Sequence, residues 1–407
     1  MKIKLFRIHS DIEDLEREQY SNQYIDDINI ALASDDIELT SETDSPINLV
    51  FVESGGSEAK FVELLPSLTE PILILQSSKY NSLPATLEIN TYCHLNNIQA
   101  IMILGSKDEC VSFLKNVSNF LMTREEIKGS RLGVIGKPSD WLIASKVDYK
   151  EVKEKFFIDI VDIPYEEFID EINKEILPDI KIYDELLEKV HNDVNRLNSA
   201  LHIYSALKRL INLYNLDGLT VRCFDLLSSH KTTSCLALAL LNQENIVATC
   251  EGDVPTMITM YIMQKVSGFS SFQANPSSLE FDKKEILFSH CTLPLNMCRS
   301  YTLDTHFESK LGIGIKGELD TVRASVVKLC PDLKTVLAVS GNINKNESYE
   351  GYCRSQISMS FDPRSVMAFA TIPFGNHVVI SYGDYYKDFL QYIELSLSLY
   401  ETKKDKE

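Results

Sequence analysis

Short apolar runs that alternate with longer amphipathic stretches constrain the fold of this chain most strongly. Amphipathic stretches such as Ser57–Leu65 and Lys107–Met122 have the length and spacing of helices. The strand-like runs between such stretches are Lys2–Ile8, Ile47–Val52, Pro71–Leu75, Gln99–Leu104 and Arg131–Ile135. This alternation is typical of βαβ units that build a parallel sheet. We therefore expect an N-terminal α/β domain over residues 1–140.

A glycine pair follows one of these expected strands. Ile47–Val52 ends in Glu53-Ser-Gly-Gly56. Ligands of parallel sheets bind outside the carboxyl ends of the strands, so Gly55-Gly56 is a candidate binding loop. A plain turn between strand and helix explains the pair equally well.

The alternation continues with longer helices over residues 141–268, where we expect a second α/β domain. Apolar residues from Leu187 to Tyr214 recur at helical spacing, and we interpret this stripe as a packing face within the domain. The other expected elements are strands Ile158–Ile163, Leu219–Phe224 and Asn245–Cys250 and helices Thr233–Leu241 and Val254–Val266.

Helical periodicity fades after Gly268, and strand-like runs take its place. They lie at Glu285–Phe288, Thr321–Leu329, Thr335–Ser340, Gln356–Met359, Met367–Ile372 and Val378–Tyr382. This texture predicts a mostly antiparallel, barrel-like domain over residues 269–407, with a helix at Tyr386–Tyr400 and a disordered tail from Lys403. The expected fold class is two parallel-sheet α/β domains followed by a β-rich C-terminal domain.

Composition narrows the possible partners and the compartment. The 407 residues include 40 Lys and Arg against 59 Asp and Glu, which gives a net charge of −19. Such a charge repels phosphate backbones and anionic lipids, so we expect neither nucleic acid nor membrane as a partner. The longest apolar run, Cys235–Leu241, is far shorter than the roughly 18 residues of a membrane span. Nine scattered cysteines and a start without a secretory segment favour the cytoplasm.

Three polar residues stand where expected strands meet turns. Glu251 follows the strand Asn245–Cys250, His290 closes another strand, and His377 precedes a third. Carboxylate and neutral imidazole together suit Mn²⁺, Fe²⁺, Co²⁺ or Zn²⁺. A helix cap would explain a carboxylate here as well, but Asp253 is the better placed cap. We therefore expect Glu251, His290 and His377 to converge on one metal ion. Gly312–Gly317 matches a dinucleotide motif, but a strand-like run follows it, so no nucleotide cofactor is expected.

Several motifs of the C-terminal half resemble the L-fucose/L-arabinose isomerase superfamily, and most of all its shorter bacterial fucose-isomerase-like members. The likeness runs from about Val221 to Asp384, while the N-terminal half agrees mainly in its α/β pattern. The motifs are Cys250-Glu-Gly-Asp-Val-Pro255, Phe272-Gln-Ala-Asn-Pro276, Phe288-Ser-His-Cys-Thr-Leu-Pro294, Thr305-His-Phe-Glu-Ser309, Leu311-Gly-Ile-Gly-Ile-Lys-Gly317 and Phe374-Gly-Asn-His377.

The resemblance implies an enzyme that interconverts an aldose and a ketose through an enediolate, with a divalent metal, typically Mn²⁺. By position, Glu251 matches the first metal-binding carboxylate of the superfamily and His377 its late metal-binding histidine. His290 matches a histidine that lines or ligates the same site in some members. The resemblance also implies a monosaccharide substrate and a homo-oligomer, a trimer or a hexamer.

Asn275 departs from the superfamily pattern, because the better-known isomerases have a second acidic metal ligand at this place. An amide oxygen can bind a metal, but the side chain cannot abstract a proton. Glu251 and Glu308 are therefore the expected catalytic carboxylates. Other candidates for the base are Asp225, Asp253 and Glu280, and the candidates for sugar contacts are Arg222 and Lys231. The alternative function is a non-catalytic sugar-binding homologue that lacks a complete set of metal ligands and base.

Overall fold

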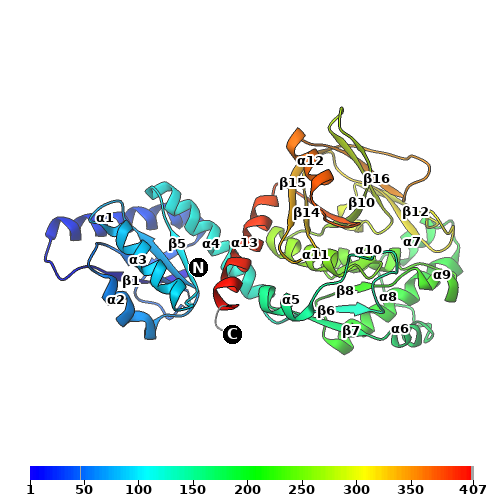
Figure 1. Cartoon of the computed structure of the whole chain (residues 1–407). Coiled ribbons are helices and arrows are strands. Elements are labelled where there is room, and N and C mark those ends of the chain that lie inside the picture. The colour runs from blue at the N-terminus through cyan, green and yellow to red at the C-terminus, as the bar shows by residue number, and fades with distance from the viewer. Residues whose placement is uncertain (46, 405–407) are drawn as a thin grey trace. The chain divides into compact units, whose positions relative to one another are not determined.

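The computed structural model describes residues 1–45 and 47–404 and divides into two compact units. The first unit comprises residues 1–122 and the described part of 394–407, and the second comprises residues 123–393. The chain passes from one unit to the other within α4 (Lys107–Ile127) and α13 (Tyr386–Lys404). Figure 1 labels these elements. Lys403 and Lys404 of the tail expected to be disordered belong to α13, and its last residues lie outside the described part.

The first unit is built on a parallel sheet with strand order β2-β1-β3-β4-β5. Its strands are β1 (Lys2–Ile8), β2 (Glu38–Thr40), β3 (Asn48–Val52), β4 (Ile72–Gln76) and β5 (Ala100–Ile103). Its helices are α1 (Leu15–Leu32), α2 (Glu58–Leu64), α3 (Ser82–Leu95) and the first part of α4. Short 3-10 helices lie at Ala33–Asp35 and Leu65–Ser67.

Helices cover both faces of this sheet, because successive side chains of a strand point to opposite sides. Val50 and Val52 of β3 pack in one cluster with Phe61 of α2 and residues of α3. Phe51, between them, stacks on Tyr24 of α1 at 5.6 Å between ring centroids. Both faces of β3 are therefore buried, in keeping with its apolar residues Leu49–Val52, and the expected α/β organisation is confirmed.

The second unit contains another parallel sheet, with order β7-β6-β8-β9. Its strands are β6 (Ser130–Ile135), β7 (Ile158–Ile163), β8 (Gly218–Val221) and β9 (Val247–Cys250). The run Arg131–Ile135, which we expected in the N-terminal domain, thus pairs in the second sheet. Alternation alone does not tell which sheet a strand joins.

The helices of this sheet follow its strands closely. They are α5 (Tyr149–Phe156), α6 (Tyr165–Ile172), α7 (Tyr183–Lys189), α8 (Val194–Tyr214), α9 (Asp225–Ser229), α10 (Cys235–Gln243) and α11 (Val254–Ser267). The stripe from Leu187 to Tyr214 lies mostly on α8, and its residues Leu197, Leu201 and Leu207 are fully buried in the core of the unit. The stripe is therefore a packing face, as expected.

The β-rich part of the second unit is a closed barrel with order β10-β11-β16-β15-β14-β17, and all its strand pairs are antiparallel. The barrel strands are β10 (Phe272–Glu280), β11 (Glu285–His290), β14 (Arg323–Leu329), β15 (Val336–Asn346), β16 (Ser355–Ser360) and β17 (Val378–Tyr382). A separate antiparallel pair consists of β12 (Ser300–Asp304) and β13 (Gly314–Glu318), and a 3-10 helix lies at Leu295–Met297.

One expected strand is wrong: Met367–Ile372 falls mostly in helix α12 (Pro363–Thr371). Asp362 caps this helix, and Pro363 occupies its first turn. An Asp followed by Pro is a helix-start signal that outweighs the β-like run after it.

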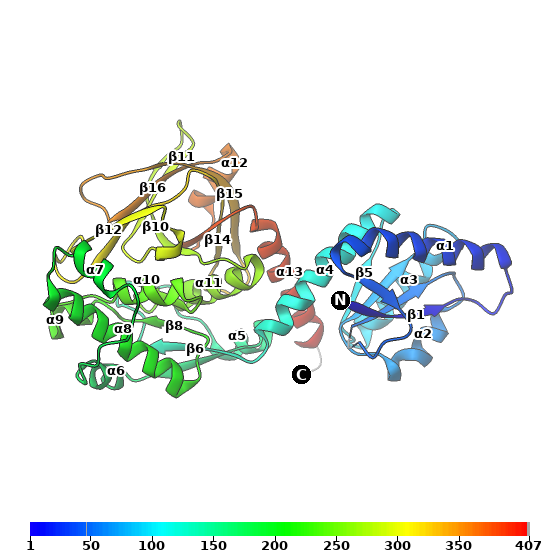
Figure 2. The same ribbon diagram turned by 180° about the vertical axis from the view of Figure 1, so that it is seen from behind.

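Helix α11 connects the two halves of the second unit. It contacts β8 and β9 of the sheet as well as β14 and β17 of the barrel. Figures 1 and 2 show α11 between the sheet and the barrel from two sides. The carboxyl end of β9, where α11 begins, is therefore next to the barrel. The expected domain boundaries at residues 140 and 268 stay predictions.

A search for membrane spans covered the described residues. None of their helices combines the length and the apolar character that crossing a bilayer requires.

Candidate metal centre

The turn after β9 holds Glu251 in an unusual backbone conformation. Glu251 and Gly252 both have positive φ angles, 67° and 68°. A Cβ atom on residue 252 would lie 2.6 Å from the carbonyl oxygen of Lys137, so this position requires glycine. The left-handed conformation is unfavourable for a glutamate, and such strain is concentrated at functional sites.

The structure brings Glu251 together with His290 and His377. His290 is the last residue of β11, and His377 directly precedes β17. One potential ligand atom of each residue lies within 4.8 Å of those of the other two, and all three residues are buried. This spacing leaves room for one cation, and the three residues come from the sheet and from two barrel strands.

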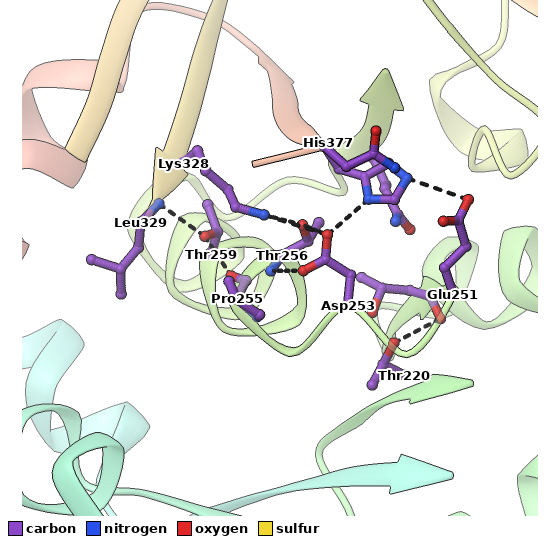
Figure 3. A network of polar contacts seen from close by, with 12 residues as sticks. Thr220, Glu251, Asp253, Pro255, Thr256, Thr259, Lys328, Leu329 and His377 are labelled. Atoms are coloured by element: carbon purple, nitrogen blue, oxygen red, sulfur yellow. Dashed lines mark hydrogen bonds and ion pairs between the residues drawn. The ribbon is translucent and has the colours of Figure 1, made fainter. Parts of the chain in front are cut away.

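His377 is fixed by a carboxylate on one side and faces Glu251 on the other (Figure 3). Its Nδ1 lies 2.8 Å from Oδ2 of Asp253, which can only accept a hydrogen bond. Its Nε2 lies 3.5 Å from Oε1 of Glu251, is fully buried, and has no hydrogen-bond partner among the described residues. A buried ring nitrogen that faces a carboxylate and a second imidazole fits a metal ligand.

The charge state of His377 follows from its surroundings. Burial disfavours the imidazolium, but the contacts with Asp253 and Glu251 outweigh burial and raise the pKa of His377 to about 9. A proton on Nε2 thus takes the place that a metal ion would take, because both neutralise Glu251.

His290 is prepared for a ligand role in a different way. Burial lowers the pKa of His290 to about 3, and the nearby His377 acts in the same direction, so its imidazole is neutral at pH 7. Its Nδ1 lies 3.0 Å from the hydroxyl of Thr292, which can accept a hydrogen bond from Nδ1–H and so leave the lone pair on Nε2. A neutral ring is the form that binds metals.

Glu251 is ionised, and one of its two carboxylate oxygens already accepts a hydrogen bond. Burial raises the pKa of this carboxyl, but the contacts with His377 and His290 outweigh burial and bring the pKa below its ordinary value. Its Oε2 accepts a hydrogen bond of 2.6 Å from Nε1 of Trp141, the one tryptophan of the chain. Oε1 is therefore the oxygen that faces His377. Two imidazoles and a carboxylate suit a divalent ion such as Mn²⁺, Fe²⁺, Co²⁺ or Zn²⁺.

A cavity of about 420 Å³ opens beside this cluster, and Glu251 and His290 belong to its wall. The volume lies in the range of small-molecule sites. Two further predicted residues, Glu308 and Asn275, line the same cavity. The Asn275 amide lies 3.4 Å from the amide oxygen of Asn376.

The structure does not bring the other predicted residues to this cavity. The Arg222 guanidinium binds Asp140 at 2.7 Å and Asp225 at 2.9 Å. Two of the predicted residues, Arg222 and Asp225, are therefore paired with each other. Glu280 pairs with Lys283 on the surface. Lys231 is exposed. None of these residues is among the described residues that line the cavity.

Asp253 has the capping role that the sequence predicts, since it accepts a hydrogen bond from the backbone of Thr256 at the start of α11. Its contact with His377, which joins residues 124 apart, was missed. No local pattern signals such a contact. His306, in the motif with Glu308, was also missed as a cavity residue, although its place beside a candidate base could have indicated it.

Five of the nine cysteines line the cavity as well: Cys223, Cys235, Cys250, Cys291 and Cys353. All nine are free thiols. Because they are scattered in sequence, their convergence carries no local signal.

Comparisons with known proteins relate this chain to sugar isomerases, although no protein-family model matches it. It is 20% identical over 263 residues to sulfoquinovose isomerase of Alkalicoccus urumqiensis, which covers 60% of this chain and 59% of that protein. It is 29% identical over 117 residues to sulfoquinovose isomerase of Clostridium sp. (strain MSTE9), which covers 28% of this chain and 26% of that protein. The sulfoquinovose isomerase of Priestia aryabhattai is 22% identical over 320 residues, covering 69% of this chain and 68% of that protein. The match thus spans between about a quarter and two thirds of the length of these relatives.

Proposed function

We propose that this chain is a divalent-metal-dependent isomerase that interconverts an aldose and a ketose, with Mn²⁺ as the metal. The observation that carries the proposal is the buried Nε2 of His377, which makes no hydrogen bond to the described residues and faces Glu251 and His290. The latter two residues line a cavity of about 420 Å³. The relatives named sulfoquinovose isomerase support the same reaction class.

The chain's own residues divide the work of this reaction. Glu251, His290 and His377 would hold the metal, and Asp253 orients His377. A bound divalent ion would polarise the carbonyl group of the open-chain sugar and stabilise the negative charge that develops on its oxygen. The remaining requirement is a base that moves a proton between C1 and C2.

Glu308 is the residue we propose for this proton transfer. Among the described residues that line the cavity, it is the carboxylate outside the proposed ligand set. His306 is less suited, because its Nδ1 accepts a hydrogen bond of 3.4 Å from the backbone N–H of Ser309. Its ring proton is then on Nε2, from which it can donate to a sugar hydroxyl but not accept a proton.

The substrate proposed first is sulfoquinovose, the sugar in the names of the relatives. Neutral aldoses form the second group, because the described residues lining the cavity include no Lys or Arg to pair with an anionic substituent. A screen of sulfoquinovose and neutral aldoses with added Mn²⁺ ranks these substrates by the rate of ketose formation.

Metal analysis and turnover test the function together. We expect about one Mn²⁺ per chain and turnover that chelation abolishes. Glu251→Gln or His377→Ala should lose both while the fold is kept. A protein that stays metal-free in excess Mn²⁺, and binds sugar equally well after both substitutions, would instead be the non-catalytic sugar-binding homologue, which Asn275 favours.

Glu308→Gln separates the base from the ligands. This variant should bind Mn²⁺ with the affinity of the wild type but lose turnover by about 10²–10⁴-fold, the usual contribution of a general base. Unchanged turnover would remove Glu308 from the mechanism, and His306→Gln would then be the next variant to test.

Assembly into a trimer or hexamer stays a prediction that rests on the family resemblance. The stripe on α8 does not support it, since Leu197, Leu201 and Leu207 are buried inside the second unit. The mass of the protein in light scattering tests it, and a monomer would contradict it.

A further inference from the structure

A fully buried lysine stands behind the histidine of the metal centre. Lys328, on β14, is 1% exposed, and its Nζ lies 3.5 Å from Oδ2 of Asp253. Nζ also contacts the hydroxyl of Thr256. Figure 3 shows Lys328 and His377 approaching Asp253 from different sides.

Asp253 is the centre of this network and is itself fully buried. Its Oδ1 accepts from the backbone N–H of Thr256 at 3.1 Å. Its Oδ2 accepts from the Thr256 hydroxyl at 2.7 Å and from Nδ1 of His377 at 2.8 Å. With Lys328 added, contacts from α11, β14 and the residue before β17 fix the carboxylate.

Stability alone does not account for a lysine at this place. Removing an ammonium group from water is expensive, and a buried ion pair is often no more stabilising than apolar side chains of the same volume. Burial indeed lowers the pKa of Lys328, against the influence of Asp253. What the lysine adds over an apolar residue is direction, because its ammonium group, together with Thr256, holds the carboxylate of Asp253 in place.

The direction of that carboxylate determines the direction of His377. A metal-binding imidazole is oriented by the group that accepts its other N–H, and that group acts well only if it is itself held in place. Here a displacement of Asp253 would rotate the ring and turn Nε2 away from Glu251 and His290.

We propose that Lys328 is a positioning residue of the metal centre, which acts through Asp253 to hold Nε2 of His377 toward Glu251 and His290. This inference rests on the proposed metal site but not on the identity of the sugar. It adds Lys328 to the site, although this residue lies 49 positions before His377 in the sequence and contacts neither a proposed metal ligand nor the substrate.

The affinity for Mn²⁺ alone tests the proposal. Lys328→Met removes the charge and leaves an unbranched side chain that is one atom shorter. We expect the Kd for Mn²⁺, measured by titration with electron paramagnetic resonance detection, to rise about 10–100-fold. At saturating Mn²⁺, kcat should return close to the wild-type value, because Lys328 does not touch the reacting atoms.

Lys155 provides a matched control within the same unit. It is 2% exposed and pairs with Glu151 of the same helix, α5, at 2.6 Å. Neither residue belongs to the proposed metal centre. Lys155→Met should also lower the stability of the fold but leave the Kd for Mn²⁺ within about twofold, since it removes a buried lysine that has no contact with Asp253.

A double-mutant cycle shows whether Lys328 acts through Asp253. Asp253→Asn should weaken Mn²⁺ binding at least as much as Lys328→Met, and the double variant should be no weaker than Asp253→Asn alone. Wild-type affinity in Lys328→Met, or additive losses in the double variant, would overturn the proposal. If Lys328→Met fails to fold, Thr256→Val interrupts the same network and should raise the Kd by about 5-fold, the equivalent of one hydrogen bond.

The test separates this inference from the proposed function. Loss of Mn²⁺ affinity in Lys328→Met supports the positioning role even if no sugar is isomerised. An isomerase whose Mn²⁺ affinity is indifferent to Lys328 keeps the function and rejects the role.

Discussion

Two glutamates of this chain occupy corresponding places in two parallel sheets, yet only one belongs to a candidate metal centre. Glu53 follows β3 in the first unit, and Glu251 follows β9 in the second. Both are buried, both precede a turn with a positive-φ glycine, and a helix begins shortly after each. The local sequence pattern is therefore nearly the same.

The difference lies in what the neighbouring strand provides. Arg7, on β1, places its Nε 2.6 Å from the Glu53 carboxylate and neutralises it. Arg222 follows β8, the neighbour of β9, but its guanidinium pairs with Asp140 and Asp225. Glu251 faces the imidazoles of His377 and His290 instead.

A permanently charged arginine leaves no place for a metal ion, whereas an imidazole can exchange its proton for one. The comparison teaches that a strand-end carboxylate becomes a candidate ligand only through its neighbours. In the second unit those neighbours come from the barrel.

The largest expected effect separates the two glutamates directly. Glu251→Gln should raise the Kd for Mn²⁺ by about 10³-fold or more, since it removes the one anionic ligand of the proposed set. Glu53→Gln should leave this Kd unchanged. Isothermal titration of both variants with Mn²⁺ makes the measurement, and equal effects of the two substitutions would break the comparison.

The stability of the metal-free protein should depend on pH through His377. The folded state raises the pKa of His377 from 6.5 to about 9, so its contacts stabilise the fold fully below pH 6.5. That contribution, on the order of 3 kcal/mol, is lost as the pH rises through about 9. Urea unfolding in chelator at pH 6 and pH 9.5 measures it.

The control for this measurement is His377→Gln, which should show a correspondingly smaller decline of stability over the same pH interval. An identical decline in both proteins would mean that His377 is not protonated in the metal-free fold. Addition of saturating Mn²⁺ should remove the decline in the wild type, because the ligand form of the imidazole is neutral.

The ion pair of the first unit should contribute to stability alone. Arg7→Met leaves the Glu53 carboxylate buried without its cation, which should lower the free energy of unfolding by about 1–3 kcal/mol. Urea unfolding gives this value, while Mn²⁺ binding and turnover should be unaffected in the folded protein. A loss of Mn²⁺ affinity here would contradict the view that this glutamate is purely structural.

The smallest expected effect concerns the amide in the cavity wall. Asn275→Asp places a second carboxylate where the better-known isomerases of the resembled superfamily have one, and should tighten Mn²⁺ binding by about 3–10-fold. The Kd from the same titration gives the answer. An unchanged Kd in this variant would place Asn275 outside the reach of the metal.

The sequence predicts the fold class well because its signals are local. Short apolar runs such as Leu49–Val52 indicate a parallel sheet, and the strand-like runs after Gly268 indicate the antiparallel barrel. Local signals do not assign a strand to a sheet, as β6 shows, and a β-like run can be overruled by a start signal, as Asp362-Pro363 shows for α12.

The candidate site could be predicted only as far as single residues stand out at strand ends. Glu251, His290 and His377 do so. Asp253, Lys328 and Trp141 contribute through contacts with residues 75 or more positions away, which depend on how the barrel packs on α11. Arg222 was misleading, because its place at a strand end suggests sugar contacts while two nearby aspartates occupy it.

The origins of the three proposed ligands have a consequence for unfolding. One belongs to the end of the parallel sheet and two belong to the barrel, so a bound ion would act as a cross-link between them. Such an ion adds RT ln(1 + [M]/Kd) to stability, about 2.7 kcal/mol at a hundredfold excess over Kd. It would therefore raise the temperature at which sheet and barrel unfold, and calorimetry in chelator should show a correspondingly lower unfolding temperature.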